Sequence, residues 1–212
     1  SWKATPIPSG GILYAAADEL VEGATRWAAW RAEGGMGGGV VSRTQIESEA
    51  AHGYPDPRAL RHWLQMQSTR PGTVLVMGDA GHDFRTPSSV TAARFPSLMI
   101  RTAYGRAASD VASGDLDGDG WADVGVFRLP VKTVAQMDAL RGRIGTVEAE
   151  AESMAGRALL VADQSGDAGD FTADNGAVAE RLGRRFPTRR VEAATVGTAG
   201  LRTARLGGLA EG

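Results

Sequence analysis

Short apolar stretches alternate along this chain with stretches whose apolar residues recur at helical spacing, and this alternation limits the possible fold more than any other feature. Strands that alternate with helices are typical of α/β proteins, in which helices connect parallel strands and cover the sheet. The sequence therefore predicts an α/β fold with a mainly parallel sheet flanked by helices. The expected strands are 11–16, 73–77, 97–104, 124–127, 158–162 and 190–195.

Four helices with recognisable starts or apolar faces are expected between these strands. The predicted start signals are Asp18, Asp56 with Pro57 behind it, and the capping box of Thr133 and Gln136. Gly34 and Gly35 are expected to end the first helix. The predicted buried stripes are Leu20, Ala24, Trp27 and Ala28; then Leu60, Trp63 and Leu64; then Met137, Leu140, Ile144 and Val147; and finally Ala177, Val178, Leu182 and Phe186.

Composition excludes several classes of partner. With 25 acidic and 23 basic residues, the chain has no excess positive charge that would bind nucleic acid. It has no run of about 18 apolar residues, so we expect no membrane span. It also contains no cysteine, which excludes disulfides, thiolate metal sites and a cysteine nucleophile within these 212 residues.

The stretch from Gly114 to Pro130 begins with an acidic pattern that is typical of a calcium loop. Alternate residues of a tight turn point the same way, and glycine permits the backbone angles that such a turn needs. A bound Ca²⁺ would turn the mutual repulsion of clustered carboxylates into coordination. The other interpretation is a solvated acidic turn. The expected ligands are Asp115, Asp117, Asp119 and Asp123, with the carbonyl of Trp121 at the seventh position and the glycines at 118 and 120.

Two further polar stretches follow apolar strands. Asp79, His82 and Asp83 come after the strand at 73–77, where a metal-dependent hydrolase would place ligands, but the partner motifs of such a centre are missing and a structural turn is favoured. The second stretch follows the strand at 158–162 and carries Asp163, Asp167, Asp170 and Asp174. Asp110 is expected to reach the calcium loop.

The chain is expected to have three parts: an extended lead-in at 1–10, a first α/β subdomain at 11–152 with the calcium loop at 115–123, and the start of a second subdomain at 153–212. Residues 197–212 resemble a crossover helix with no returning strand behind it. A parallel sheet left at that point would have an unpaired edge. We therefore expect the fold to be incomplete at its C-terminus and completed by a longer chain or a second chain.

Three motifs in this order resemble the gingipain-like cysteine peptidases, which have a caspase-like core. They are VLVMGDAGHD, GDLDGDGWADVGVFRLPVKT before a long helix, and ALLVADQSGDAGDFTADNG. The resemblance covers most of the chain, as the amino-terminal portion of the catalytic domain. It implies secreted, extracellular bacterial enzymes that calcium stabilises and that cleave peptide or protein substrates. The family usually has glycine before Arg-Leu-Pro, where this chain has Phe127.

The resemblance also implies a His-Cys dyad, in which histidine activates the thiol for attack on the peptide carbonyl. The family's histidine lies in a Gly-His-Gly turn that His52, His62 and His82 do not match, and cysteine is absent. No catalytic residue is therefore assigned, and this chain alone is expected to be inactive. In arginine-specific members a carboxylate before the following helix lines the substrate pocket, and Asp170 occupies that position. Its alternatives are a helix cap or a second calcium site with Asp167 and Asp174.

Two functions follow from these motifs. The first is the amino-terminal part of a calcium-stabilised, secreted cysteine endopeptidase, which needs a downstream segment or second chain to supply His and Cys. The second is a noncatalytic calcium-binding interaction or adhesion module that uses the same loop for rigidity.

Overall fold

Four parallel strands in the order β2-β1-β3-β6 form the main sheet of the computed structural model, which describes residues 9–80, 95–150, 156 and 158–210. The strands are β1 (Ile12–Ala16), β2 (Gly38–Ser42), β3 (Thr73–Met77) and β6 (Gly125–Leu129). β1 therefore pairs with β2 on one side and with β3 on the other. The chain passes from β1 to β2 on one side of β1 and then to β3 on the other side, so the strand order reverses between β1 and β3. α/β proteins commonly have their binding sites at such a switch point.

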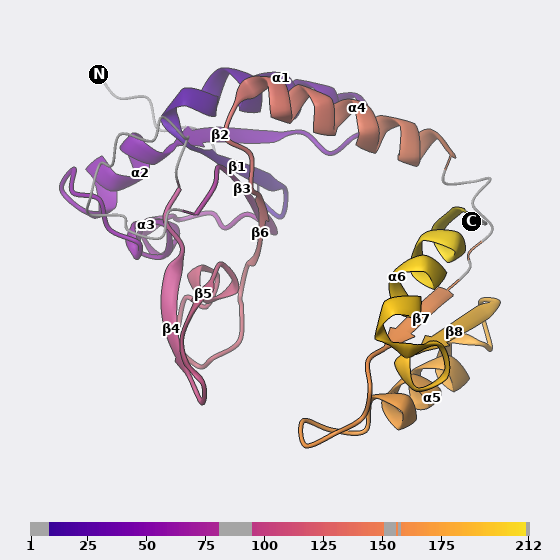
Figure 1. The fold of residues 1–212 in the computed structure, drawn as a ribbon. Coiled ribbons are helices and arrows are strands. Elements are labelled where there is room, and N and C mark those ends of the chain that lie inside the picture. The colour runs from indigo at the N-terminus through magenta and orange to yellow at the C-terminus, as the bar shows by residue number, and fades with distance from the viewer. Residues whose placement is uncertain (1–8, 81–94, 151–155, 157, 211–212) are drawn as a thin grey trace. The chain divides into compact units, whose positions relative to one another are not determined.

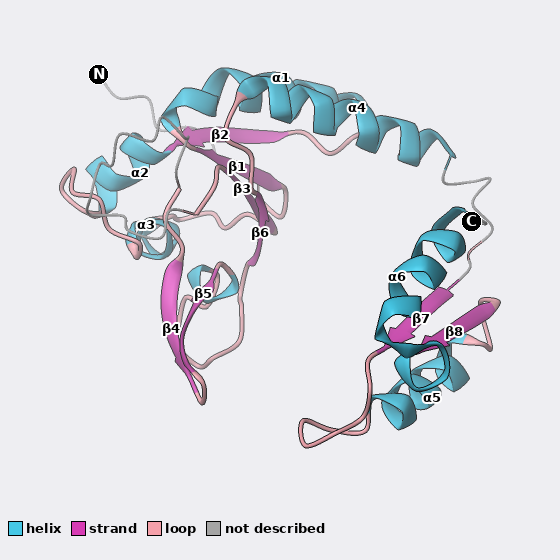
Figure 2. Ribbon diagram, viewed as in Figure 1, coloured by secondary structure: helices cyan, strands magenta, loops and turns pink. Residues whose placement is uncertain are grey.

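Helices cover both faces of this sheet. The helix α1 (Val21–Glu33) and the first half of α4 (Val134–Glu150) lie side by side on one face, and α2 (Arg43–Ala50) and α3 (Ala59–Met66) lie on the other (Figures 1 and 2). α1 and α4 approach so closely that a Cβ on Gly23 would lie 2.6 Å from the Sδ of Met137. These observations confirm the predicted α/β class with a mainly parallel sheet flanked by helices.

Successive side chains along each strand point to opposite faces of the sheet, so the core has two layers. Leu13 and Ala15 of β1 pack with α3, whereas Tyr14 and Ala16, which point to the opposite face, are equally buried. The layer against α2 and α3 is completed by apolar residues of the other strands and of two loops: Val41, Val74, Val76, Val126, Phe95 and Leu116. The loop residue Leu116 thus anchors the acidic turn in the core.

The predicted helix boundaries need several corrections. Asp18 opens a 3₁₀ turn, η1 (Asp18–Leu20), and its carboxylate accepts a hydrogen bond from the Thr44 amide instead of capping α1. Asp56 and Pro57 lie in the turn before α3, which begins at Ala59. The helix α2, whose start is capped by Ser42, was not predicted because Ile46 is its one fully apolar buried residue.

Residues 98–109, which lie between β3 and β6 in the sequence, form a small antiparallel sheet instead of one more parallel strand. β4 (Leu98–Thr102) pairs with β5 (Gly105–Ser109) in a hairpin, and the 3₁₀ turn η2 (Val111–Ser113) leads from β5 into the acidic loop. Most hairpin residues are exposed. The sequence predicts β4, but not β5, because the small residues of β5 have low strand propensity.

The chain divides into two units, Ser1–Gly142 and Arg143–Gly212, and the division falls inside α4. The expected subdomain bounds, with a boundary after residue 152, stay a prediction. The second unit contains a parallel pair, β7 (Ala158–Ala162) and β8 (Thr188–Glu192), with α5 (Phe171–Leu182) and α6 (Ala193–Ala210). β8 begins at Thr188 and ends at Glu192, so it overlaps the expected strand at 190–195 only in residues 190–192. Val147 in α4 is 54% exposed, so the expected buried stripe ends before it.

None of the described helices is long and apolar enough to cross a membrane.

Candidate metal centre

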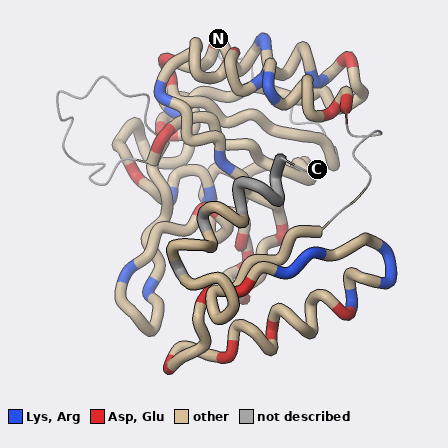
Figure 3. The backbone as a smooth tube through the Cα atoms, turned by 45° about the vertical axis from the view of Figure 1, so that its right-hand side comes forward, with Lys and Arg blue, Asp and Glu red and all other residues tan. Residues whose placement is uncertain are grey.

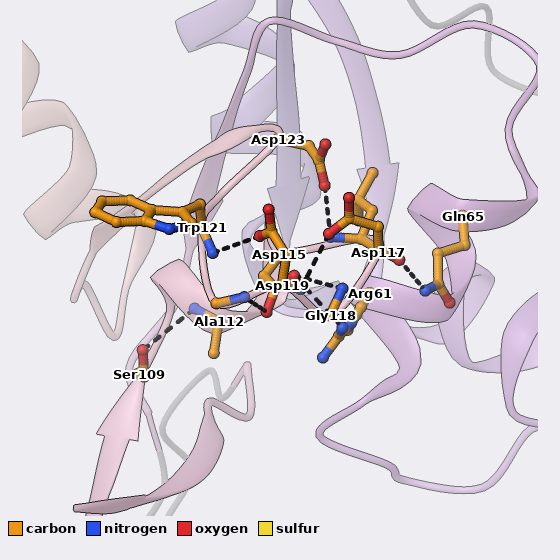
Figure 4. A network of polar contacts seen from close by, with 12 residues as sticks. Arg61, Gln65, Ser109, Ala112, Asp115, Asp117, Gly118, Asp119, Trp121 and Asp123 are labelled. Carbon is orange, nitrogen blue, oxygen red and sulfur yellow. Dashed lines mark hydrogen bonds and ion pairs between the residues drawn. The ribbon is translucent and has the colours of Figure 1, made fainter.

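The acidic loop folds on itself through its own carboxylates, which accept hydrogen bonds from backbone amides (Figure 4). Asp115 accepts from the amides of Gly118 and Gly120, at 2.7 and 3.3 Å. Both glycines have positive φ, +87° and +93°, which confirms their predicted role because a Cβ would strain the turn. Asp123 accepts from the Leu116 amide at 2.8 Å, so the two ends of the loop are held together.

Three of the predicted ligands lie close enough to share one ion. A carboxylate oxygen from each of Asp115, Asp117 and Asp123 lies within 4.8 Å of the other two. Two oxygens that each bind calcium at about 2.3–2.6 Å can be separated by roughly 5 Å at most, so this spacing fits one Ca²⁺. Hard carboxylate oxygens are also the donors that calcium prefers. The donor set therefore fits a divalent cation such as Ca²⁺.

The other two predicted ligands are placed differently. The carboxylate of Asp119 lies outside the three-carboxylate group and accepts a hydrogen bond from the Trp121 amide at 2.8 Å. The side chain of Trp121 is 79% exposed. Coordination by Asp119 and by the Trp121 carbonyl therefore stays a prediction.

The helix α3 holds the loop from the side of the core. Gln65 donates to the carbonyl of Leu116 at 2.6 Å, and an Arg61 nitrogen lies 3.7 Å from an Asp115 oxygen (Figure 4). The 3.7 Å separation is longer than a charge-assisted hydrogen bond of about 2.8 Å. Arg61 therefore acts on Asp115 through charge more than through a directed bond, and it was not predicted from the sequence.

Arg128 links the carboxyl ends of β3 and β6 to the hairpin. Its guanidinium makes a bidentate pair with Asp110, with both contacts at 2.7 Å, and it also donates to the carbonyls of Gly78 and Phe95 and to the Ser97 hydroxyl. The expectation that Asp110 reaches the calcium loop is therefore wrong. Alternate residues of a strand share a face, so Arg128 lies on the same face of β6 as the buried Val126. A charged residue at such a position needs a partner, and this was the signal in the sequence that could have predicted the ion pair.

Opposing effects act on the Asp110 carboxyl. Burial raises its pKa, but the hydrogen bonds from Arg128 and Ser97 and the charge of Arg128 together hold the pKa below the usual value. Asp110 is therefore ionised at neutral pH.

At the carboxyl end of β3, Asp79 forms an ion pair with Lys132 at 3.3 Å. The other members of the predicted turn, His82 and Asp83, lie outside the described residues. Asp79 is thus paired within the fold.

In the second unit, Asp170 is the N-cap of α5. Its Oδ1 accepts hydrogen bonds from the Ala173 amide at 3.0 Å and from the Ser165 hydroxyl at 2.7 Å. The Ala173 amide and the Ser165 hydroxyl lower the pKa of this carboxyl. Within the described residues, Asp163, Asp167 and Asp174 form no three-ligand group of the kind found at 115–123.

The comparisons with known proteins identify a family. The model of peptidase family C25 matches residues 8–203, which is more than nine tenths of the chain. No curated protein matches the sequence. A similar solved structure is the dimeric latent PorU from Porphyromonas gingivalis, with a TM-score of 0.57 and 23% identity. That alignment covers 68% of this chain and 16% of PorU, so the chain corresponds to a small part of the length of that protein.

Proposed function

The chain belongs to peptidase family C25, and we propose that it supplies the calcium-stabilised α/β scaffold of a gingipain-like cysteine endopeptidase. The family match over residues 8–203 is the observation that carries this proposal. Because the chain contains no cysteine, the proposed catalytic thiol belongs to a segment or second chain outside these 212 residues. Peptides or proteins are the proposed substrates, and the proposed location is extracellular.

In this proposal Asp115, Asp117 and Asp123 hold Ca²⁺, and Asp119 and the Trp121 carbonyl complete its coordination. The ion would neutralise clustered carboxylates and fix the loop that joins η2 to β6. Its contribution is structural, because the loop connects the hairpin to the strand that carries Arg128. The spacing of the three carboxylates supports this role.

Calcium binding is tested by calorimetric titration and by thermal unfolding in calcium or in chelator. A ligand that binds only the native state stabilises it by about 2.7 kcal/mol at a hundredfold excess over Kd. We expect calcium to raise Tm, and the double variant Asp117→Asn/Asp123→Asn to remove the shift. The control Glu180→Gln changes an exposed acid of α5 and should keep it. No shift for the parent chain would remove calcium from the proposal.

Peptidase activity is tested by supplying the missing thiol. The 212-residue chain is expected to be inactive, and the longer protein or its second chain should add activity that iodoacetamide abolishes. Absence of activity with an intact His-Cys pair present would contradict the peptidase proposal. It would favour the alternative, a noncatalytic calcium-binding interaction or adhesion module.

Asp170 is the proposed substrate-binding residue for an arginine side chain. An ionised carboxylate can form a bidentate pair with guanidinium, and the hydrogen bonds from Ala173 and Ser165 lower the pKa of Asp170 from a value already well below neutral pH. In the active protein, Asp170→Asn should reduce cleavage after arginine more than cleavage after lysine. An unchanged ratio would leave Asp170 with its capping role alone.

A further inference from the structure

A cavity of about 430 Å³ lies between the α3 segment and the hairpin of β4 and β5, and it shares Arg61 and Gln65 with the support of the calcium loop. Its volume is within the range of pockets that bind ligands. One wall is polar and the other is apolar. The lining residues are Arg58, Arg61, His62 and Gln65 on one side and Leu98, Met99, Ile100 and Ala112 on the other.

The polar wall is one face of the α3 segment. Positions 58, 61 and 65 follow one another at spacings of three and four residues, and 62 lies four after 58, which places them together, while Leu60 and Trp63 face the core. Arg58 is exposed and forms hydrogen bonds with Asp56, and Arg61 lies 3.7 Å from Asp115. The long Arg61 contact leaves its guanidinium able to donate to another anion.

The apolar wall is the outer edge of a strand. Successive side chains of a strand point to opposite faces, so a cavity that touches Leu98, Met99 and Ile100 together runs along the edge of β4. β4 pairs only with β5 among the described residues. In an antiparallel pair, half of the backbone N–H and C=O groups of an edge strand point away from its partner. This edge can therefore accept another strand.

The hairpin itself is basic. Arg101 lies directly opposite Arg106 in the register, and no acidic residue occurs between Leu98 and Ser109. In Figure 3 the two basic positions face each other across the hairpin. Like charges at opposite positions destabilise a strand pair, and an anionic partner would remove that repulsion. Met99 and Ile100 are also 52% and 39% exposed, so their side chains are open to an apolar partner.

We propose that this groove binds an extended, acidic peptide segment, which adds to the free edge of β4 as a third strand. Backbone groups of β4 pair with the peptide backbone, and Met99 and Ile100 contact the apolar side chains of the peptide. Arg58 and Arg61, which line the groove, bind its carboxylates. The exposed apolar residues and the strand edge favour a peptide over a nucleic acid, which would use neither. The net charge of −2 also gives no general attraction for polyanions.

Fluorescence anisotropy with the 212-residue chain tests this proposal. The probe is a fluorescein-labelled heptapeptide of alternating glutamate and valine, and its matched control has glutamine in place of glutamate. We expect saturable binding of the glutamate peptide and at least about tenfold weaker binding of the control, because charge-assisted pairs are lost. Hydrogen exchange should show new protection of β4 amides when the glutamate peptide binds.

Three variants sharpen the test. Met99→Glu places a like charge on the exposed edge, and Arg58→Gln removes an exposed guanidinium; each should weaken binding several-fold. Arg141→Gln on α4, which covers the other face of the sheet, should bind as the parent does. The proposal is overturned by equal affinity for the two peptides, by binding that Met99→Glu leaves unchanged, by equal binding of an oligothymidylate, or by no saturable binding of the glutamate peptide.

Discussion

Replacing Arg128 by methionine is the most direct test of how the carboxyl edge of the sheet is held together. The substitution keeps an unbranched apolar stem and removes five hydrogen bonds that join β6 to Gly78, Phe95, Ser97 and Asp110. The Arg128 side chain is 10% exposed and that of Asp110 is 23% exposed, so the pair is mostly shielded from water.

The expected cost follows from this burial. Removing one partner of a buried ion pair costs about 3–5 kcal/mol, because the other charge is left unpaired. Asp110 keeps partial access to water and its bond from Ser97, so the lower end applies, about 3 kcal/mol. For a chain of this size, that loss lowers Tm by roughly 6–12 °C.

Denaturant unfolding followed by circular dichroism measures the loss. Arg141→Met is the matched control, since Arg141 makes a weaker pair of 3.6 Å with Asp138 on the same helix. It should change stability by less than about 0.5 kcal/mol. An Arg128→Met variant no less stable than this control would refute the reasoning.

The pH dependence gives a second, independent check. The folded-state pKa of Asp110 lies below its unfolded value, so its contribution to stability is present above the unfolded pKa, about 3.9, and is lost as pH falls through the folded pKa. The stability difference between the parent and Arg128→Met should therefore shrink as the solution is acidified below about pH 4. A difference that does not change over this range would show that Arg128 acts through packing alone.

Two further substitutions test the loop and the cap. Arg61→Gln removes a positive charge near Asp115 and should tighten calcium binding about tenfold, since a unit charge about 6 Å from Ca²⁺ repels it by roughly 1.4 kcal/mol in water. Calorimetry measures the affinity, with Arg58→Gln as the control. Unchanged or weaker calcium binding by Arg61→Gln would contradict this role. Asp170→Ala should speed hydrogen exchange of the Ala173 amide, because the cap of α5 is lost. Asp170→Asn can still cap the helix and should preserve the protection of that amide. Equal exchange in the two variants would exclude a capping role.

Several features of the fold and the site follow from local patterns. The apolar stretches that became β1, β3 and β7 and the buried face of α1 depend on period and hydrophobicity, which neighbours in sequence establish. The acidic loop is likewise local. Its carboxylates bond to amides two to seven residues away, and its glycines adopt left-handed angles within the same turn.

Tertiary structure decided the features that depend on distant partners. Asp110 was expected at the calcium loop but pairs with Arg128, because the hairpin turns its carboxylate toward the carboxyl end of β6. β5 is a strand because β4 pairs with it, although its small residues have low strand propensity. Gly38 shows the same principle: the glycine run fits a strand because a Cβ there would lie 1.8 Å from the Ile12 carbonyl oxygen of the neighbouring strand.

The physical difference is the range of the interactions. Periodicity, turn angles and carboxylate spacing are determined over a few residues, and the sequence alone determined the α/β class and the candidate metal loop. The pairing of charged side chains and the exposure of a strand edge depend on chain segments that come together only when the sheet forms. The Arg128–Asp110 pair, the Arg61–Asp115 contact and the groove beside β4 were therefore decided by the tertiary structure.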